Sequence, residues 1–306
     1  MTTNIHWFPG HMAKAIKKID EQSKLIDLVI EIVDSRIPFS SSNPLVDNLR
    51  GSKPKLVILN KKDLADPVTI KSWLNYYQQQ QISVLPLDSK HANITKLIIE
   101  KINFICAPKM ERDKKWGIKT PKVKVLVIGI PNVGKSTFIN ALVKRNSARI
   151  GNKPGVTKGQ QWLKLNQQID LVDTPGILWP KIEDSQVALN LAFTRSIKDD
   201  ILPKEEICLA AIKWMQQHYF SLLVKEYHLT TRDNFVITDE RDLFQLLLIM
   251  QQNRFHKVDE GNVNNIVTDF LNKLWNNKFG LMSFEFPPAS GATNTWWINL
   301  NKRYIL

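Results

Sequence analysis

Apolar residues follow two kinds of pattern along the chain, and the change between them falls near residue 178. Before that point, short apolar runs such as Leu28–Val33, Leu56–Leu59 and Val123–Ile128 alternate with segments of helical periodicity. Buried parallel strands separated by helices produce this alternation. From Trp179 onward, apolar residues recur at helical spacing only. The pattern predicts an α/β domain, with a mainly parallel sheet flanked by helices, followed by a small all-helical domain.

The boundaries of individual elements follow from the same pattern. We expect strands at 28–33, 56–59, 82–87, 123–128 and 169–172, and helices at 12–24, 66–80, 93–106, 183–197, 204–227, 239–252 and 262–278. Residues 108–121 lie between two prolines and hold five Lys and Arg, so we expect an exposed basic linker there. The predicted domains are 1–178, including an N-terminal segment 1–24, and 179–306, with a terminal extension from about residue 287.

The most specific chemical motif directly follows the run Val123–Ile128. It reads Gly129-Ile130-Pro131-Asn132-Val133-Gly134-Lys135-Ser136, the pattern of a phosphate-binding loop. The two glycines keep side chains away from the backbone N–H groups that cradle phosphates, while Lys135 supplies a positive charge and Ser136 a hydroxyl for Mg²⁺. An accidental glycine turn is the alternative, but the strand before it and the amphipathic segment after it argue against this. We therefore expect Asn132, Val133, Gly134, Lys135, Ser136 and Thr137 to bind a nucleotide.

A second motif, Asn60-Lys61-Lys62-Asp63, follows the apolar run Leu56–Leu59. The carboxylate of Asp63 can accept hydrogen bonds from two ring donors of guanine that adenine does not offer. Lys61 is expected to lie along the base, and Asn60 to tie the loops together. Alone, four residues are a weak match, and a polar loop is the commoner explanation; the phosphate-binding loop makes guanine the favoured ligand. Asp88-Ser89-Lys90 follows the next strand and is a weaker candidate for contact with the base.

A third motif, Asp173-Thr174-Pro175-Gly176, follows the strand expected at 169–172. Asp173 is expected to hold Mg²⁺ through water, and Gly176 to offer its N–H to the γ-phosphate of GTP. Thr157 lies in the loop between the two phosphate-binding motifs and is a candidate switch residue. The guanine-binding motif precedes the phosphate-binding loop, the reverse of the usual order. A chain can be cut and rejoined in this way without changing the packed sheet, because domain termini often lie close together.

Lys and Arg are concentrated in the first part of the chain. Residues 1–178 hold 28 Lys and Arg against 14 Asp and Glu, whereas residues 179–306 hold 14 against 15. A basic domain commonly binds nucleic acid or another polyanion; a charge that only aids solubility is the alternative. No apolar run reaches the ~18 residues of a membrane span, and the N-terminus lacks the form of a signal peptide. Cys106 and Cys208 lie in apolar runs, and we expect reduced core residues of a cytoplasmic protein.

The rotated order of motifs, together with Trp7-Phe8-Pro9-Gly10-His11-Met12 and Asp34-Ser35-Arg36-Ile37-Pro38, resembles ribosome biogenesis GTPase A, the YlqF-type family of circularly permuted GTPases. The resemblance covers roughly residues 4–285. It implies hydrolysis of GTP to GDP, with the precursor of the large ribosomal subunit, its RNA and its proteins, as partner and activator. It also implies that the nucleotide state is coupled to RNA and ribosome binding. We expect no membrane partner, and a monomer off the ribosome.

The resemblance also implies roles for particular residues. Many GTPases place a Gln after the Asp-x-x-Gly motif to orient water, but Ile177 stands there and can neither donate nor accept a hydrogen bond. The family points instead to His11, for which packing on Trp7 is the alternative. It further implies K⁺ dependence, with Asn132 helping to hold the cation unless it is only a loop residue. The expected catalytic residues are His11, Lys135, Thr157 and Gly176, and the expected Mg²⁺ site comprises Ser136, Thr157 and Asp173.

Three other functions remain as alternatives. The first is an RNA-docking nucleotide switch whose hydrolysis is little stimulated; Ile177 favours slow intrinsic turnover, so this alternative differs mainly in whether the partner accelerates hydrolysis. The second is a permuted GTPase acting on the small ribosomal subunit; the absence of a zinc-type Cys/His cluster in the sequence argues against it. The third is an ATPase, against which Asp63 argues.

Overall fold

A computed structural model of the chain describes residues 5–6, 17, 19–21, 23–90, 93–143, 161–179, 181–198, 201–230, 240–256 and 262–288. Within them, a six-stranded sheet has the order β4-β3-β2-β5-β7-β6. Its strands are β2 (Leu28–Asp34), β3 (Lys55–Asn60), β4 (Ser83–Pro86), β5 (Val123–Ile128), β6 (Gln161–Lys164) and β7 (Ile169–Asp173). Neighbouring strands are parallel except β6, which runs antiparallel to β7. The predicted mainly parallel α/β fold is confirmed.

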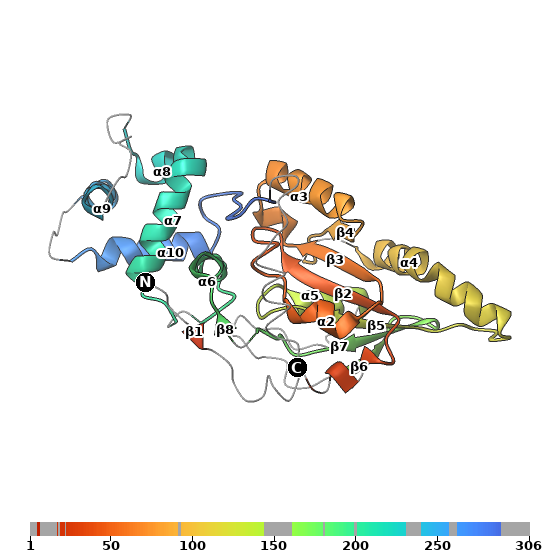
Figure 1. The fold of residues 1–306 in the computed structure, drawn as a ribbon. Coiled ribbons are helices and arrows are strands. Elements are labelled where there is room, and N and C mark those ends of the chain that lie inside the picture. The colour runs from red at the N-terminus through yellow and green to blue at the C-terminus, as the bar shows by residue number, and fades with distance from the viewer. Residues whose placement is uncertain are drawn as a thin grey trace.

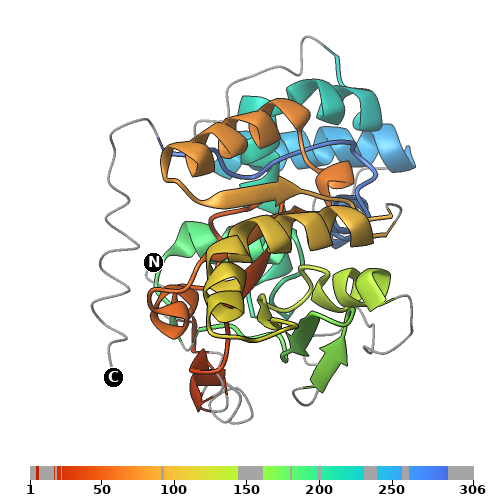
Figure 2. The ribbon, with the colours of Figure 1, turned by 90° about the vertical axis from the view of Figure 1, so that its right-hand side faces the viewer.

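Helices cover both faces of this sheet (Figures 1 and 2). The helices are α2 (Leu45–Arg50), α3 (Pro67–Gln79), α4 (Thr95–Lys115) and α5 (Lys135–Val143), with a short 3₁₀ helix η1 (Lys62–Leu64). On one face, α4 and α5 bury residues such as Ile98 and Phe138 against β2 and β5. On the other face, α2 packs on β2, β5 and β7, and α3 packs Trp73 on β3. Burial on both faces explains why the central strands are apolar throughout rather than alternating.

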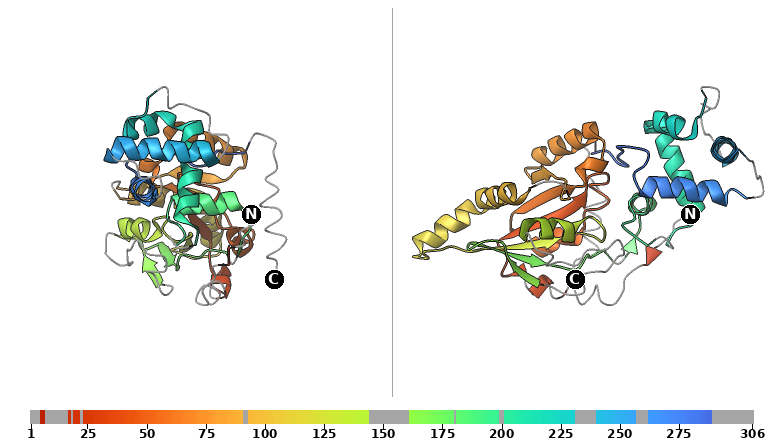
Figure 3. Two further views of the ribbon diagram at one scale, coloured as in Figure 1. Left: turned by 90° about the vertical axis from the view of Figure 1, so that its left-hand side faces the viewer. Right: turned by 180° about the vertical axis from the view of Figure 1, so that it is seen from behind.

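The second half of the chain is helical and lies beyond one end of the sheet (Figure 3). Its elements are α6 (Ser185–Phe193), α7 (Lys204–His218), α8 (Phe220–Tyr227), α9 (Glu240–Phe255) and α10 (Asn264–Trp275). The buried apolar cluster on the α4 and α5 face of the sheet continues into these helices. A short strand, β1 (Ile5–His6), pairs antiparallel with β8 (Lys181–Ile182) just before α6. The two halves are therefore packed against each other.

The chain returns from α10 to the sheet half through residues 279–286, which we call the return segment. Its backbone donates hydrogen bonds from Met282 to the Leu64 carbonyl at 3.2 Å and from Phe284 to the Arg36 carbonyl at 2.8 Å. The carboxylate of Glu285 accepts hydrogen bonds from the Ser40 backbone and hydroxyl. The return segment thus fastens the end of the helical half to loops at the carboxyl ends of β2 and β3.

Two sequence expectations about helices are wrong. The basic linker expected at 108–121 is largely helical, because α4 continues to Lys115 with Pro108 inside it. Proline at this position removes the hydrogen bond to the carbonyl of Phe104, and both residues are exposed, so water can satisfy that carbonyl. The single helix expected at 204–227 is interrupted at Tyr219, where φ is −142°. This break places the Tyr219 hydroxyl where it accepts a hydrogen bond from the Ser283 amide at 3.0 Å.

Other outcomes concern single elements. Cys106 and Cys208 are buried and unpaired, as expected. Among the described residues, no helix is long and apolar enough to cross a membrane. The strand β6 and the helix α2 were not predicted. The helix expected at 12–24 lies largely outside the described residues, and so does most of the extension expected after residue 287.

Candidate nucleotide-binding site

The sequence motifs expected to bind nucleotide meet at the carboxyl ends of adjacent parallel strands. Asn60 ends β3, Gly129 follows β5 and Asp173 ends β7, and β2 lies between β3 and β5 in the sheet. Because parallel strands end at one edge, loops that are far apart in sequence converge there. The rotated order of the motifs therefore does not separate them in space.

The loop between β5 and α5 has a backbone that requires glycine. Gly134 has φ of +91°, and a Cβ there would lie 2.3 Å from Asn60 Nδ2. A Cβ on Gly129 would lie 2.7 Å from the Ile32 carbonyl oxygen. The loop then enters α5, whose first residues are Lys135, Ser136 and Thr137. Backbone N–H groups at a helix start favour bound phosphate, and the absent side chains leave room for it.

Lys135 and Asp173 form a buried ion pair at this edge of the sheet. The Lys135 ammonium donates a hydrogen bond to Asp173 Oδ1, and the two side chains are only 5% and 1% exposed. Burial lowers the pKa of Lys135, and the Asp173 carboxylate opposes that shift. The pair brings together the cation expected to bind phosphate and the carboxylate expected to bind Mg²⁺.

Asn60 links the loops after three strands. Its Nδ2 donates to the Val133 carbonyl at 2.8 Å, which joins the end of β3 to the phosphate-binding loop. Its Oδ1 accepts from the Ser89 hydroxyl at 2.7 Å and from the Ser89 amide at 3.3 Å. Asn60 is 2% exposed, so these bonds are shielded from water. The side chain fixes the relative position of the phosphate-binding and base-binding loops.

Lys61 lies across the phosphate-binding loop and is held by an acid that sequence reasoning did not place in the site. Its ammonium donates to the Asn132 carbonyl at 2.7 Å and to Asp34 Oδ2 at 2.9 Å. Burial lowers the pKa of Lys61, and Asp34 opposes the shift. The left-handed backbone at Lys61, with φ of +59°, turns the chain sharply between β3 and η1. The aliphatic stem of Lys61 is thereby held over the loop that starts α5.

Asp34 and Arg36 form the neighbouring ion pair. Arg36 donates to Asp34 through Nε at 3.0 Å and Nη2 at 2.8 Å, and Asp34 is fully buried. Burial disfavours the carboxylate, but Arg36 and Lys61 outweigh it and hold the pKa of Asp34 well below its usual range. The available sequence signal was an Asp directly after a buried strand with a cation two residues later. The segment Asp34-Ser35-Arg36-Ile37-Pro38 contributes to the family resemblance, but no local sequence pattern predicts that Asp34 binds Lys61.

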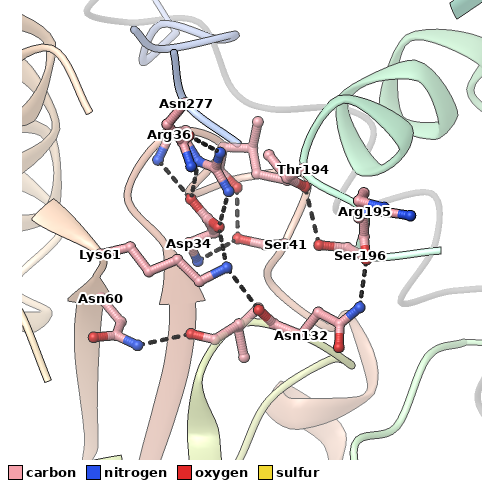
Figure 4. A network of polar contacts seen from close by, with 12 residues as sticks. Asp34, Arg36, Ser41, Asn60, Lys61, Asn132, Thr194, Arg195, Ser196 and Asn277 are labelled. Atoms are coloured by element: carbon pink, nitrogen blue, oxygen red, sulfur yellow. Dashed lines mark hydrogen bonds and ion pairs between the residues drawn. The ribbon is translucent and has the colours of Figure 1, made fainter. Parts of the chain in front are cut away.

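The same network reaches the helical half of the molecule at two points (Figure 4). Arg36 Nη1 donates to Asn277 Oδ1 at 2.8 Å, just after the end of α10. Asn132 Nδ2 donates to the Arg195 carbonyl at 2.5 Å, just after the end of α6. The Arg195 guanidinium in turn lies 4.6 Å from the centre of the Trp275 ring. The phosphate-binding loop therefore contacts the helical half directly, whereas Asp34, which binds Lys61, is linked to the helical half through Arg36.

The base-binding candidates differ in exposure. Asp63 lies in η1 and is exposed, so its carboxylate faces solvent at the edge of the site. In the loop after β4, Ser89 is buried while Lys90 is exposed. The Lys90 amide donates to Asp88 Oδ1 at 2.9 Å, which closes a tight turn. A direct role for residues 88–90 in base contact stays a prediction.

The loop after β7 packs on the phosphate-binding loop. A Cβ on Gly176 would lie 3.1 Å from the Pro131 backbone, so the two loops are in close contact. The Thr174 hydroxyl donates to the Val127 carbonyl at 2.9 Å, and the Ile177 amide donates to the Gly129 carbonyl at 3.2 Å. The Ile177 side chain is 1% exposed in the core with α2. It is a packing residue and has no polar group with which to orient water.

Two expected residues lie outside the described part of the chain, namely His11 and Thr157. The donor set that is described fits a nucleotide with Mg²⁺: Ser136 supplies a hydroxyl as the second residue of α5, and Asp173 supplies a carboxylate that pairs with the neighbouring Lys135. No group of three or more His, Cys, Asp and Glu side chains within the described residues is arranged to hold a metal by itself.

Three features define a P-loop GTPase with a permuted order of motifs. They are the mainly parallel sheet, the phosphate-binding loop before α5, and the Asn-Lys-x-Asp motif that starts at the end of β3. A family described as "50S ribosome-binding GTPase" matches residues 124–203. Ribosome biogenesis GTPase A from Bacillus pumilus is 40% identical over 287 residues, which cover 93% of this chain and 99% of that protein. The chain belongs to the ribosome biogenesis GTPase A family and is a GTP-hydrolysing enzyme.

Other relatives agree with this assignment. Ribosome biogenesis GTPase A from Priestia megaterium is 45% identical over 226 residues, which cover 74% of this chain and 78% of that protein. The crystal structure of GNP-bound YlqF from T. maritima superposes with a TM-score of 0.58 at 24% identity, covering 90% of this chain and 98% of that one. At this identity the superposition supports the fold alone.

Proposed function

We propose that this GTPase acts in assembly of the large ribosomal subunit, that the subunit stimulates its hydrolysis of GTP, and that its nucleotide state controls binding to RNA and the ribosome. The observation that carries the proposal is the joining of the guanine-binding and phosphate-binding loops through Asn60 and Lys61. The match to a family described as 50S ribosome-binding supports the choice of subunit. The excess of Lys and Arg in residues 1–178 supports a polyanionic partner.

In the proposed mechanism, Asp63 accepts two hydrogen bonds from guanine, and Lys61 lies along the base. Lys135 leaves Asp173 and places its ammonium on the β- and γ-phosphate oxygens. Ser136, Thr157 and Asp173 would hold Mg²⁺, which when bound neutralises charge on those oxygens. Gly176 donates its N–H to the γ-phosphate, and this contact moves the loop that packs on Pro131. The residues thus stabilise developing negative charge by preorganised donors.

The attacking water needs a polar group from elsewhere, because Ile177 is buried and apolar. We assign this role to His11, because a neutral imidazole can align or deprotonate water near pH 7. Asn132 is proposed to help hold K⁺ beside the phosphates. The amide oxygen Oδ1 would coordinate the cation while Nδ2 keeps its hydrogen bond to the Arg195 carbonyl just after α6, so the two contacts are compatible.

Contacts between the halves supply a route by which nucleotide alters the helical half. We propose that residues 1–178 and 179–306 behave as two domains in the cytoplasm, where the protein is a monomer off the ribosome. A nucleotide that contacts Lys61 and Asn132 changes two hydrogen bonds, the one from Lys61 to Asp34 and the one from Asn132 to the Arg195 carbonyl. Arg36 binds both Asp34 and Asn277, so a change at Asp34 alters the contact with Asn277 just after α10. The helical domain thereby has two arrangements relative to the sheet, one favoured by GTP and one by GDP.

The test is GTP hydrolysis in potassium buffer, alone and with purified large or small ribosomal subunits, for the parent and His11→Ala. Stimulation by large subunits only, lost in His11→Ala while the variant still binds GTP and subunits, is the expected result. Retained stimulation in His11→Ala would move the water-orienting role to another group. Stimulation by small subunits only would contradict the large-subunit assignment. Binding of subunits without stimulation would favour an RNA-docking switch, and equal rates in sodium would remove the role of K⁺.

A further inference from the structure

The end of α4 farthest from the helical half carries an exposed aromatic ring among cations. We call residues 109–124 the α4 tip; they include the last turns of α4 and the chain that leads into β5. Figure 1 shows this tip projecting beyond the sheet, at the opposite end from α6–α10. Trp116 is 74% exposed there, although large aromatic side chains are normally buried. A projecting, exposed tryptophan offers a surface that a partner can cover, because tryptophan is enriched at interfaces.

The charge around Trp116 is strongly positive. The α4 tip holds seven Lys and Arg against two acidic residues, and the cations Arg112, Lys114, Lys115, Lys119 and Lys122 are all exposed. Of the two acids, Asp113 is buried and bound to Lys109 at 2.7 Å. Cations in the last helical turn offset the helix dipole, which accounts for Arg112, Lys114 and Lys115. The helix dipole does not account for Lys119 and Lys122, which lie beyond the helix, nor for the exposed ring of Trp116.

The tip is a fixed structure rather than a loose tail of charge. α4 ends in two closing hydrogen bonds, from Gly117 N–H to the Lys114 carbonyl at 3.0 Å and from Ile118 N–H to the Asp113 carbonyl at 3.1 Å. Gly117 supplies the positive φ, +84°, that this helix ending requires. Lys109 also donates a hydrogen bond to the Lys122 carbonyl, which ties the helix to the chain that follows. Trp116 is therefore presented at a defined position.

The Arg112 guanidinium lies over the Trp116 ring, 5.9 Å from its centre, and the residue remains 74% exposed. A flat aromatic face beside several cations matches an unpaired base next to phosphates, because every base has a face that stacks on an aromatic ring. An acidic protein would also pair with the cations, but a nucleotide uses both features at once, since its base stacks on the indole and its phosphate meets the cations. We propose that the α4 tip docks on RNA by stacking Trp116 on an unpaired base while Arg112, Lys119 and Lys122 hold the adjoining phosphates.

This inference rests on the proposed function for the identity of the partner, ribosomal RNA. It adds a second contact point, remote from the helical half. In Figure 2 the molecule is turned so that α4 lies toward the viewer. Binding at both ends of the molecule would align the sheet between two sites on RNA, so the nucleotide-dependent movement of one half could be transmitted to the other site.

The first experiment uses fluorescence anisotropy with a labelled RNA hairpin that has a purine-rich loop, and with a blunt duplex of the same stem. We expect the parent to prefer the hairpin. Trp116→Ala should weaken hairpin binding about tenfold or more and abolish the preference, whereas Trp116→Phe should keep most of it. The matched control is Phe104→Ala, since Phe104 is 75% exposed on the same helix beside Lys101 but lies outside the cationic tip. The double variant Lys119→Ala with Lys122→Ala should weaken binding of the hairpin and the duplex equally, and should reduce the salt dependence of that binding.

Unchanged melting temperature and intrinsic GTP hydrolysis would show that the Trp116 variants remain folded. Equal hairpin binding by the parent and Trp116→Ala would overturn the proposal, and so would equal losses in Phe104→Ala. Polyglutamate that competes as well as RNA of equal charge would also overturn it. Large-subunit stimulation of hydrolysis separates the two claims: if the parent is stimulated but Trp116→Ala binds RNA normally, only the tip proposal fails. If subunits do not stimulate the parent but Trp116→Ala loses the hairpin, only the proposed function fails.

Discussion

Gly134 tests whether the two nucleotide-binding loops really depend on each other. The change is Gly134→Ala, which adds one carbon at a residue whose φ is +91°. The added Cβ would lie 2.3 Å from Asn60 Nδ2, the atom that binds the Val133 carbonyl. Backbone strain at positive φ costs about 1–2 kcal/mol. Displacing Asn60 breaks a buried hydrogen bond and costs about 1–3 kcal/mol more.

The matched control is Gly117→Ala, because Gly117 has a similar φ of +84° but nothing within 4 Å of the added Cβ. It should show the strain alone, a loss of about 1–2 kcal/mol in the free energy of unfolding. Gly134→Ala should lose about 2–5 kcal/mol, the sum of the strain and the lost hydrogen bond. Its affinity for GDP should fall at least about tenfold, since each 1.4 kcal/mol is a factor of ten. Gly117→Ala should bind GDP like the parent.

The assays are denaturant unfolding and titration with a fluorescent GDP analogue. A double-mutant cycle with Asn60→Ala isolates the clash, because this variant lacks the Asn60 side-chain amide that the added Cβ of Gly134→Ala would contact. Gly134→Ala should cost less in the Asn60→Ala background than in the parent. The reasoning is refuted if the two costs add, or if Gly134→Ala binds GDP within twofold of the parent.

Further predictions concern the charged groups. Lys135→Ala should lower GTP turnover by about a hundredfold or more, because a preorganised cation is lost from the phosphates; turnover within threefold of the parent would contradict its role. Arg36→Met should lower the free energy of unfolding by about 3 kcal/mol, since it leaves the buried Asp34 to Lys61 alone. The control Arg50→Met should lose less than about 1 kcal/mol, because the Arg50–Asp47 pair is 31% and 28% exposed; equal losses in denaturant unfolding would refute this ordering. Burial raises the pKa of Glu285 from 4.5 to about 7. The Glu285 carboxyl therefore binds a proton more tightly in the folded protein than in the unfolded chain. The stability that the protonated carboxyl contributes is lost as pH rises from about 4.5 to about 7. Glu285→Gln should flatten that part of the stability profile, and an unchanged profile would exclude Glu285 as its source.

The sheet and the main parts of the site could be predicted because their sequence signals are local. Apolar runs locate the strands, and the motifs at Asn60 and Gly129 follow directly after two of them. The parallel arrangement then brings the motifs together without any knowledge of distances. The length of α4 could not be predicted in this way, because Pro108 is tolerated only where the carbonyl that loses its partner is exposed.

Contacts between distant parts of the chain were beyond the sequence patterns. Arg36 and Asn277 are separated by 241 positions, and Ser40 and Glu285 by 245, so no periodicity connects them. The return segment 279–286 holds three phenylalanines and one acid, Glu285, but no sequence motif that indicates what it contacts. Its role becomes apparent only when its amides and carboxylate meet the loops after β2 and β3. Long-range polar contacts of this kind decide how the two halves are joined.

The central claim is that Asn60–Asp63 and Gly129–Ser136 form one site for a guanine nucleotide, and Asp63→Asn tests it most directly. Asn can accept from the N1–H of the base but donates where guanine also donates, whereas xanthine presents an oxygen at that position. The measurement is the affinity for GDP and for xanthosine diphosphate, in the parent and in Asp63→Asn. The account predicts that the parent prefers GDP by at least about a hundredfold and that Asp63→Asn prefers xanthosine diphosphate. Preference for GDP that is unchanged in Asp63→Asn would contradict the account.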